Sequence, residues 1–299
     1  MWTSTRCAAR PSGSPMGGAP AAQAQRRIEL GGVSVDLLRI GTFRSDAGTI
    51  FGPVPRTSWE PLVRNEIDDA SRLLQALNLL VVTTPERRML LETGLLPAGE
   101  RSSDASTDAL SAREGLTAAG IDPASIELVV PSHLHRDHAG GLADASGAAA
   151  FPRATVVAPQ REIDAVASSS LRARAAYDTA TLRALFAANA PRAFERTSEP
   201  DARVELRLLG GHTPGSQATI VRGSERTLLF LGDLFMRPWQ SNPRWVTAYD
   251  DEAWVSVDAK TSIFAEAAAG EWLVAMSHEV AAPLGRLVAD GDRFRFIAE

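Results

Sequence analysis

Short apolar runs, several with a two-residue alternation, recur along the chain and predict a fold rich in β-strands. We expect folded sequence to begin at Ile28, with a strand over 33–40 and a hairpin formed by 79–82 and 89–91. Further strands are predicted over 126–130, 154–158, 204–209, 217–221, 227–231, 272–276 and 294–297. Residues 41–75 contain glycine, proline and scattered aromatic residues with weak periodicity, which predicts a long irregular segment.

Helical patterns are fewer and come late in each half of the chain. Residues 107–119 place Leu110, Leu116 and Ala119 on one face and end at Gly120, and 171–190 and 256–269 also have helical composition. No short-period repeat is present. This order predicts an α+β fold in which two packed sheets are flanked by helices, in preference to an alternating parallel βαβ arrangement.

Composition narrows the class of protein. The 299 residues are 44% hydrophobic and 22% charged, which is typical of a globular domain with a substantial core. A net charge of −5 argues against a nucleic-acid partner, and no apolar run is long enough for a membrane span. The single cysteine, Cys7, excludes both an intrachain disulfide and a thiolate metal site. We therefore expect a cytoplasmic protein, and the sequence leaves open whether it forms a homodimer.

Residues 1–27 differ from the remainder of the chain. They are rich in Ala, Gly, Ser and Pro, contain four arginines and have no acidic residue. A secretory signal requires a continuous apolar stretch, which is missing here, and an organellar transit peptide is a second interpretation. We prefer a disordered tail, or an upstream start codon with the true start at Met16. The predicted division is a tail over 1–27 and one domain over 28–299.

The five histidines all fall where a two-metal site would need ligands. Three lie in one loop that ends in two glycines, and the other two, together with one aspartate, each follow a predicted strand: His133, His135, His138, His212, His278 and Asp233. A lone histidine is more often an ordinary core or surface residue, but this joint arrangement favours metal binding. Imidazole and carboxylate without thiolate suit Zn²⁺, and also Mn²⁺, Fe or Co²⁺.

The spacing predicts how the ligands divide between two ions. In an extended backbone His133 and His135 project to the same side, and Asp137 and His138 follow where the loop must turn. We assign three ligands to the first ion, three to the second and one as a bridge, in the order His133, His135, His212; Asp137, His138, His278; and Asp233. Two divalent ions about 3.5–4 Å apart can share a hydroxide near neutral pH.

This pattern resembles the metallo-β-lactamase superfamily. The likeness runs from about Val33 to the end of the chain and is carried, in the family's order, by 133–138, Gly211-His212-Thr213-Pro214-Gly215, Gly232-Asp233 and His278. It implies an αββα sandwich with the metals at one edge, and a hydrolase domain over 28–299. The segments 51–55 with Trp59, 245–251 with Ala259-Lys260, and His278-Glu279 are similar to the quorum-quenching lactonase branch, and 238–240 is similar to methyl-parathion-hydrolase-like proteins.

Two positions depart from the family's pattern. Some lactonases of the superfamily carry a tyrosine three residues after the bridging aspartate, where this chain has Met236. The usual Asp-Thr-Gly after the early hairpin is Glu92-Thr93-Gly94, so we expect a different contact behind the ligands there. The missing cysteine ligand argues against the best-known zinc β-lactamases, and a tail of 21 residues after His278 argues against glyoxalase II-like enzymes.

The resulting hypothesis is hydrolysis of a lactone or ester, with an N-acyl homoserine lactone among the candidates. A hydroxide shared by the two metals attacks the carbonyl carbon, and Asp137 or Asp233 carries the proton to the leaving group. We assign the pocket wall to six apolar residues, which would suit an acyl chain or aromatic ester: Phe51, Trp59, Phe235, Met236, Trp239 and Trp245.

Other functions remain open at this point. Among hydrolases they are a thioesterase or cyclase acting on carrier-bound acyl chains and a phosphotriesterase. From a different class they are a non-hydrolytic metal-binding protein or a di-iron redox protein. Di-iron flavoprotein members replace a signature histidine with a carboxylate, whereas this chain keeps His133, His135 and His138.

Overall fold

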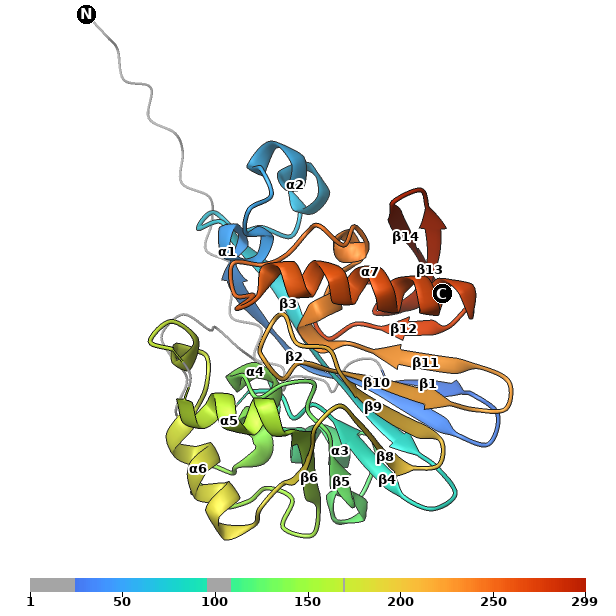
Figure 1. Ribbon diagram of the computed structural model, residues 1–299. Helices are drawn as coiled ribbons and strands as arrows, with labels where there is room; N and C mark the ends of the chain where they lie inside the picture. The colour runs from blue at the N-terminus through green and yellow to red at the C-terminus, as the bar shows by residue number, and fades with distance from the viewer. Residues whose placement is uncertain (1–24, 96–108, 169) are drawn as a thin grey trace, which may run out of the picture.

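The computed structural model describes residues 25–95, 109–168 and 170–299, and there the chain forms two mixed seven-stranded sheets (Figure 1). The first sheet has the order β1 (Gln25–Glu29), β2 (Ser34–Asp46), β3 (Arg72–Thr83), β4 (Arg88–Leu91), β5 (Leu128–Val129), β6 (Thr155–Pro159) and β7 (Arg192–Phe194). The second has the order β14 (Arg293–Ala298), β13 (Leu284–Asp290), β12 (Leu273–Ala275), β11 (Thr227–Phe230), β10 (Gln217–Arg222), β9 (Val204–Leu208) and β8 (Thr197–Asp201).

An apolar layer fills the space between the two sheets. Val35 of β2 and Leu80 of β3 meet Leu206 of β9 and Phe230 of β11 in one buried cluster. Because side chains alternate along a strand, neighbouring residues of β2 and β3 face the other way and join a second cluster beneath helices. Both faces of the first sheet are therefore buried, which explains why its central strands are apolar almost throughout.

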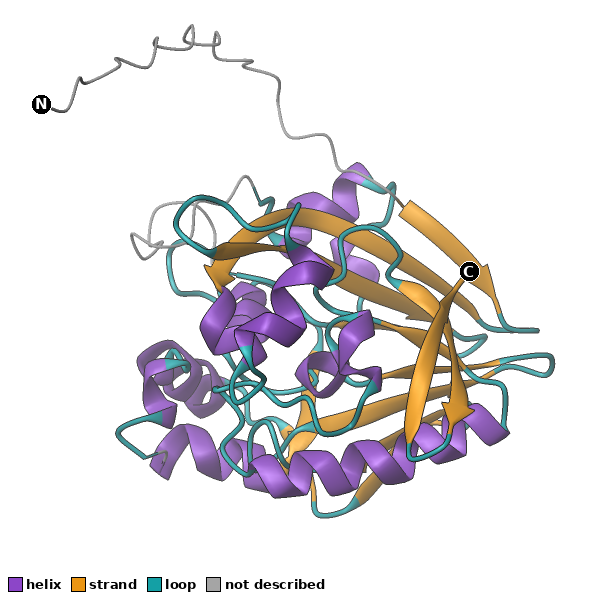
Figure 2. Ribbon diagram, turned by 90° about the horizontal axis from the view of Figure 1, so that it is seen from above, coloured by secondary structure: helices purple, strands orange, loops and turns teal. Residues whose placement is uncertain are grey.

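Helices cover the outer face of each sheet. The helices α3 (Ala112–Ala118), α5 (Gln160–Ser168) and α6 (Thr179–Ala188) contribute Leu116, Val166 and Leu182 to the cluster on the first sheet. The long helix α7 (Ala253–Ala269) lies along the second sheet (Figure 2). Its Ile263 and Phe264 belong to the buried cluster on that sheet. These layers confirm the predicted αββα sandwich. No helix in the described ranges has the length and apolarity needed to cross a bilayer.

The segment 41–75 is more regular than the prediction of a long irregular segment, which is wrong at both ends. Strand β2 continues to Asp46 and β3 begins at Arg72, and the two pair without interruption except for a shift in register between Arg39 and Gly41. This bulge breaks the two-residue alternation that would have revealed the strand. Between the strands lie α1 (Ala47–Phe51) and α2 (Arg56–Val63).

Two predicted helices differ from the structure, and several short elements were missed. Helix α3 begins after Ser111, whose hydroxyl and Glu114 form a capping box, and residues 107 and 108 lie outside the described residues. Of 171–190 only Thr179–Ala188 is α-helical, because Asp178 caps its start and Tyr177 instead pairs with His135. The predicted hairpin of β3 with β4 and the edge strand β14 are confirmed.

The sequence patterns did not reveal β1, β7, β8, β13 or α5.

The remaining helical segments are short, and two of them carry candidate ligands. They are α4 (Arg136–Ala139) and 3₁₀ turns at Pro123–Ser125, Gly140–Leu142, Ala173–Ala175, Gly232–Phe235 and Pro238–Ser241. Strand β1 begins three residues before the expected start of the domain. The expected tail over 1–27 lies almost entirely outside the described residues.

Candidate metal centre

The seven residues assigned as ligands lie together on loops that follow strands. His133 and His135 follow β5, His212 follows β9, Asp233 follows β11 and His278 follows β12. Asp137 and His138 lie in the short helix α4, directly after His135. All five histidines are buried. Residues from widely separated stretches of the chain thus converge because the strands that carry them end at the same edge of the sandwich.

The side chains form two groups with the division expected from their spacing. One group contains His133, His135 and His212, and the other contains Asp137, His138, Asp233 and His278. In each group one ligand atom per residue lies within 4.8 Å of all the others. Close contacts run within each group: His212 Nε2 is 3.2 Å from His135 Nδ1, and His278 Nε2 is 3.3 Å from His138 Nε2.

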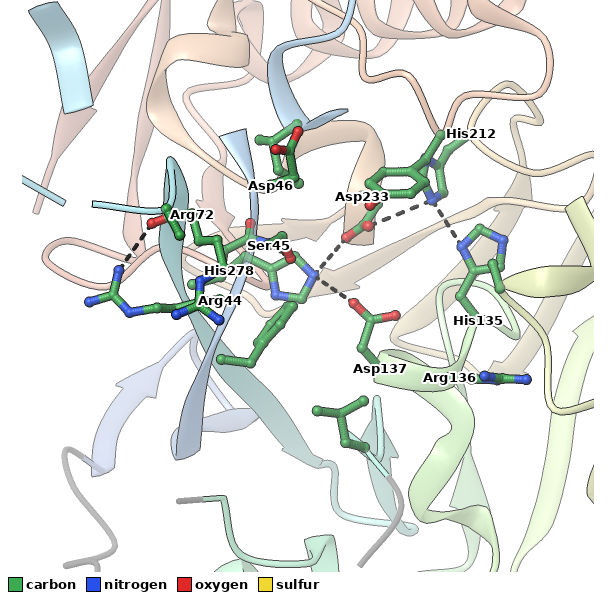
Figure 3. Close-up of a pocket in the computed structure, with 17 residues that line it drawn as sticks. Arg44, Ser45, Asp46, Arg72, His135, Arg136, Asp137, His212, Asp233 and His278 are labelled. Atoms are coloured by element: carbon green, nitrogen blue, oxygen red, sulfur yellow. Dashed lines mark hydrogen bonds and ion pairs between the residues drawn. The ribbon is translucent and has the colours of Figure 1, made fainter. Parts of the chain in front are cut away.

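Asp233 lies between the two groups (Figure 3). Its Oδ1 atom is 3.1 Å from His138 Nε2 and 3.0 Å from His278 Nε2, whereas its Oδ2 atom is 3.6 Å from His212 Nε2. Asp137, in contrast, belongs only to the second group, where its Oδ2 atom is 3.5 Å from His278 Nε2. The two oxygens of one carboxylate therefore face different groups, which is the geometry that a bridging ligand requires.

The outer ring nitrogens of the histidines are engaged by the protein. His212 Nδ1 is 3.0 Å from Asp250 Oδ1, and His278 Nδ1 is 2.8 Å from the carbonyl oxygen of Ala76. Because a carboxylate and a carbonyl can only accept, each Nδ1 carries the proton. In the neutral form of these two rings, the Nε2 atoms then carry the lone pairs, which point into the centre.

Divalent cations fit this arrangement. Unshared nitrogen lone pairs that face one another and a carboxylate repel, and a cation between them turns that repulsion into coordination. His133 gives a second sign of this: its Nδ1 lies 3.0 Å from Ser132 Oγ, whereas its Nε2 is buried and has no hydrogen-bond partner among the described residues. The fold and the clustered His and Asp residues together indicate divalent metal binding.

Burial and the charges of neighbouring side chains shift the pKa values of several histidines and of Asp233 when no metal is bound. Burial and the neighbouring imidazoles lower the pKa of His133 and His135 well below 6.5, which keeps both rings neutral. Burial also opposes the charge on His138, but Asp233, Asp137 and Glu92 raise its pKa well above 6.5. Burial would raise the pKa of Asp233, yet His138 and His278 hold it well below its usual range. These carboxylates therefore favour the protonated form of His138, and a proton competes with a cation for this side chain.

Glu92 contacts the centre from the position where the family's pattern has an aspartate. Its Oε2 atom lies 3.3 Å from His138 Nδ1, an electrostatic contact, and its Oε1 atom accepts a hydrogen bond of 3.2 Å from the backbone N–H of Ser132. The backbone of Glu92 has a φ of 67°, which is rare for a residue with a side chain. The longer side chain thus still reaches the ligand loop.

A cavity of about 560 Å³ opens onto both groups. His135, Asp137, His212, Asp233 and His278 form its floor, with Arg136 beside them (Figure 3). The end of β2 and the start of β3 supply a further part of the lining, which is mostly polar and consists of Phe43, Arg44, Ser45, Asp46, Arg72 and Gln75. Ile50, Leu95 and Tyr249 also line it.

The six residues predicted to form the pocket wall do not line this cavity. Five pack together beside it in an aromatic cluster that holds α1 and α2 on the sandwich: Phe51, Trp59, Met236, Trp239 and Trp245. Phe51 and Trp59 stack with centroids 4.6 Å apart, and Phe235 packs beneath α7. The correction has a simple reason: large apolar side chains near a site gain more from burial against one another than from lining an open cavity that carries several charged side chains.

Two further carboxylates were missed from the sequence. Asp250 holds His212 and also accepts a hydrogen bond of 2.7 Å from Thr247 Oγ1. Glu162 is buried in α5 and contacts both loops of the three-histidine group. The segment around Asp250 was noted only for its likeness to lactonases, and nothing in the pattern around Glu162 distinguishes it from a surface helix residue.

Comparison with known proteins identifies the family. The sequence model of the metallo-beta-lactamase superfamily matches residues 73–265, which is more than half of the chain and includes six of the seven assigned ligands. The chain belongs to the metallo-β-lactamase superfamily. No curated protein gives a significant match. Family membership and the clustered ligands support assignment of this superfamily member as a metal-dependent hydrolase.

Several solved structures share the fold of this chain. A probable metal-dependent hydrolase from Staphylococcus aureus has a TM-score of 0.82 at 23% identity, covering 91% of this chain and 99% of that one. AidC, a dizinc quorum-quenching lactonase in complex with a product, has a TM-score of 0.79 at 20% identity, covering 93% and 98%. The hydrolase AbOPH has a TM-score of 0.77 at 20% identity, covering 92% and 97%.

Proposed function

We propose that the chain is a dinuclear metal-dependent hydrolase that cleaves a lactone or an ester. The observation that carries this proposal is the position of Asp233, whose two oxygens face two separate groups of ligands at the floor of one cavity. Zinc suits the donors, which are nitrogen and oxygen without sulfur, and the neighbour AidC is described as dizinc. Manganese, iron and cobalt are compatible with the same donors.

The chain's own residues divide the chemical work. When bound, two divalent ions supply a hydroxide near neutral pH and polarise the substrate carbonyl. Asp233 lies between the two groups of ligands and contacts both, and it is nearly enclosed, with 10% of its side chain exposed. Asp137 has 25% of its side chain exposed and lines the cavity, so it is placed to receive a proton and to pass it to the leaving oxygen.

The cavity also constrains the substrate. Several structural neighbours are described as N-acyl homoserine lactone hydrolases, which supports a lactone as the scissile group. Arg44, Asp46 and Arg72 in the cavity lining lose hydration when a substrate covers them, and a long alkyl chain would return no hydrogen bonds. We therefore expect a short or polar acyl portion to be favoured.

Purified protein of known metal content tests the proposal against its alternatives. Hydrolysis is measured for short and long N-acyl homoserine lactones, aryl esters, thioesters and organophosphate triesters. We expect kcat/KM to be highest for a lactone or ester and to fall at least about a hundredfold in Asp233→Ala and His135→Ala. The exposed Asp292→Ala variant is the control and keeps full activity. Full activity in both ligand variants would refute the mechanism, and a preference for triesters or thioesters would refute the substrate class.

A further inference from the structure

We propose that Glu162 is the positioning residue that fixes the two ligand loops of the three-histidine group, and hence the affinity of that group for its metal ion. The inference rests on the proposed metal centre. Glu162 lies in the first turn of α5 and is fully buried, although it is none of the ligands. A carboxylate so far from water must have its oxygens satisfied by the protein.

Glu162 accepts four hydrogen bonds, three of which come from the two ligand loops. Its Oε1 atom accepts from the backbone N–H of Leu134, at 2.8 Å, and from the hydroxyl of Tyr177, at 3.2 Å. Its Oε2 atom accepts from Thr213 Oγ1, at 2.7 Å, and from the backbone N–H of Gly215, at 3.1 Å. Leu134 lies between two ligands of the first loop, and Thr213 directly follows the ligand of the second. One rigid planar group therefore sets the distance between the loops.

Tyr177 extends this control to a ligand ring. Its ring packs edge-on against His135, with centroids 4.8 Å apart and an interplanar angle of 72°. The backbones of the two residues also form an isolated β-bridge. Because the hydroxyl of Tyr177 is bonded to Glu162, the carboxylate also fixes the surface against which His135 rests.

The second loop is shaped to reach Glu162. A side chain at Gly215 would place its Cβ 2.3 Å from Glu162 Cβ, so only glycine allows the loop to approach α5 this closely. Ser216 Oγ accepts from the backbone N–H of Thr213, at 3.0 Å, and lies 2.9 Å from Thr213 Oγ1. The serine hydroxyl can donate to the threonine, which directs the hydroxyl hydrogen of Thr213 toward Glu162.

The isosteric change Glu162→Gln exposes this role. All four partners of the carboxylate are donors, and an amide offers one acceptor oxygen while its NH₂ group faces two N–H or O–H donors. The variant keeps the size of the side chain but cannot hold both loops. The variant also removes a buried negative charge next to the loops of His133, His135 and His212, the group that contains no carboxylate apart from the shared Asp233.

The experiment is a two-site zinc titration of the full-length protein against a chromophoric chelator, with bound metal counted by mass spectrometry. We expect the wild type to bind two ions and Glu162→Gln to bind one of them about ten- to hundredfold more weakly while the other is unchanged. The control is Asp201→Asn, a buried carboxyl group bonded to Thr84 Oγ1 and the backbone of Arg203, both at 2.8 Å, away from the ligand loops. It should lose stability and keep both affinities.

Unchanged affinity for both ions in Glu162→Gln, or an equal loss in Asp201→Asn, would show that Glu162 supports only the fold. If Glu162→Gln does not fold, Glu162→Asp retains the charge and shortens the reach, and it must also weaken one ion; unchanged binding in that variant overturns the inference. A wild type that binds no metal overturns the proposed function together with this inference, whereas two tightly bound ions in both wild type and variant overturn the inference alone.

Discussion

Lys260, the only lysine of the chain, offers a quantitative test of the structure behind His212. It is buried in α7, and its Nζ atom donates a hydrogen bond of 2.6 Å to the carbonyl oxygen of Trp245. Burial lowers its pKa from 10.5 to about 8, and the charge of Asp250 opposes this only in part. The ammonium group therefore destabilises the folded state, and the size of this effect depends on pH.

The direction of the pH dependence follows from the pH range over which Lys260 is protonated in the folded and in the unfolded state. Below pH 8 it is protonated in both the folded and the unfolded state, so the full cost of burying the charge is present. Between about pH 8 and 10.5 the folded state has released the proton and the unfolded state has not, so unfolding takes up a proton and the free energy of unfolding rises with pH. At 1.36 kcal/mol per pKa unit, the rise is about 3 kcal/mol.

Lys260→Met isolates this contribution. The free energy of unfolding is measured by urea denaturation of both proteins in chelator at pH 7, 8, 9 and 10. We expect the difference between wild type and variant to shift by about 2.5 kcal/mol in favour of the wild type between pH 7 and pH 10. The lost hydrogen bond to Trp245 adds only a constant offset. A difference that does not change with pH would refute the buried position of the charge.

Three further outcomes are expected. Asp250→Asn weakens the orientation of His212 and should lower metal affinity about ten- to hundredfold in a chelator competition; unchanged affinity would contradict its contact with the ring. Because the pKa of His138 is raised well above 6.5, metal binding at pH 7 should release a proton and should weaken as the pH falls. The binding heat is measured by calorimetry in buffers of different protonation enthalpy, and equal heats in all buffers would disprove the proton release. Trp59→Ala should cost about 3–5 kcal/mol of stability with KM unchanged, since Trp59 stacks on Phe51 outside the cavity, and a large rise in KM would restore it as a pocket residue.

The sequence was most informative where chemistry and position coincide. Histidine is rare in this chain, and each one follows a predicted strand, so the grouping of His133, His135 and His212 could be predicted before any geometry was known. Asp233 was predicted as the bridging ligand because it follows a strand and lies between His212 and His278 in the sequence. The sandwich itself followed from strands in pairs and runs with few helices between them.

The residues behind the ligands could not be predicted in this way. Glu162 and Asp250 reach the ligand loops only through the packing of α5 and of the turn before α7, and their local sequence is that of ordinary polar positions. The residues of the pocket wall could not be predicted for a related reason. Aromatic residues indicate burial but not the surface that buries them, and Phe51 and Trp59 are buried against each other. The cavity is instead lined by residues such as Arg44, which lies in the part of β2 hidden by a bulge.

Anomalous diffraction from crystals of the purified protein, recorded at the absorption edge of the metal it carries, addresses the central claim directly. Two peaks about 3.5–4 Å apart are expected, one among His133, His135 and His212 and the other beside His138 and His278, with Asp233 between them. A map with no peak at these side chains, or with a single ion that leaves one group empty in metal-saturated crystals, would contradict the assignment of a two-metal hydrolase.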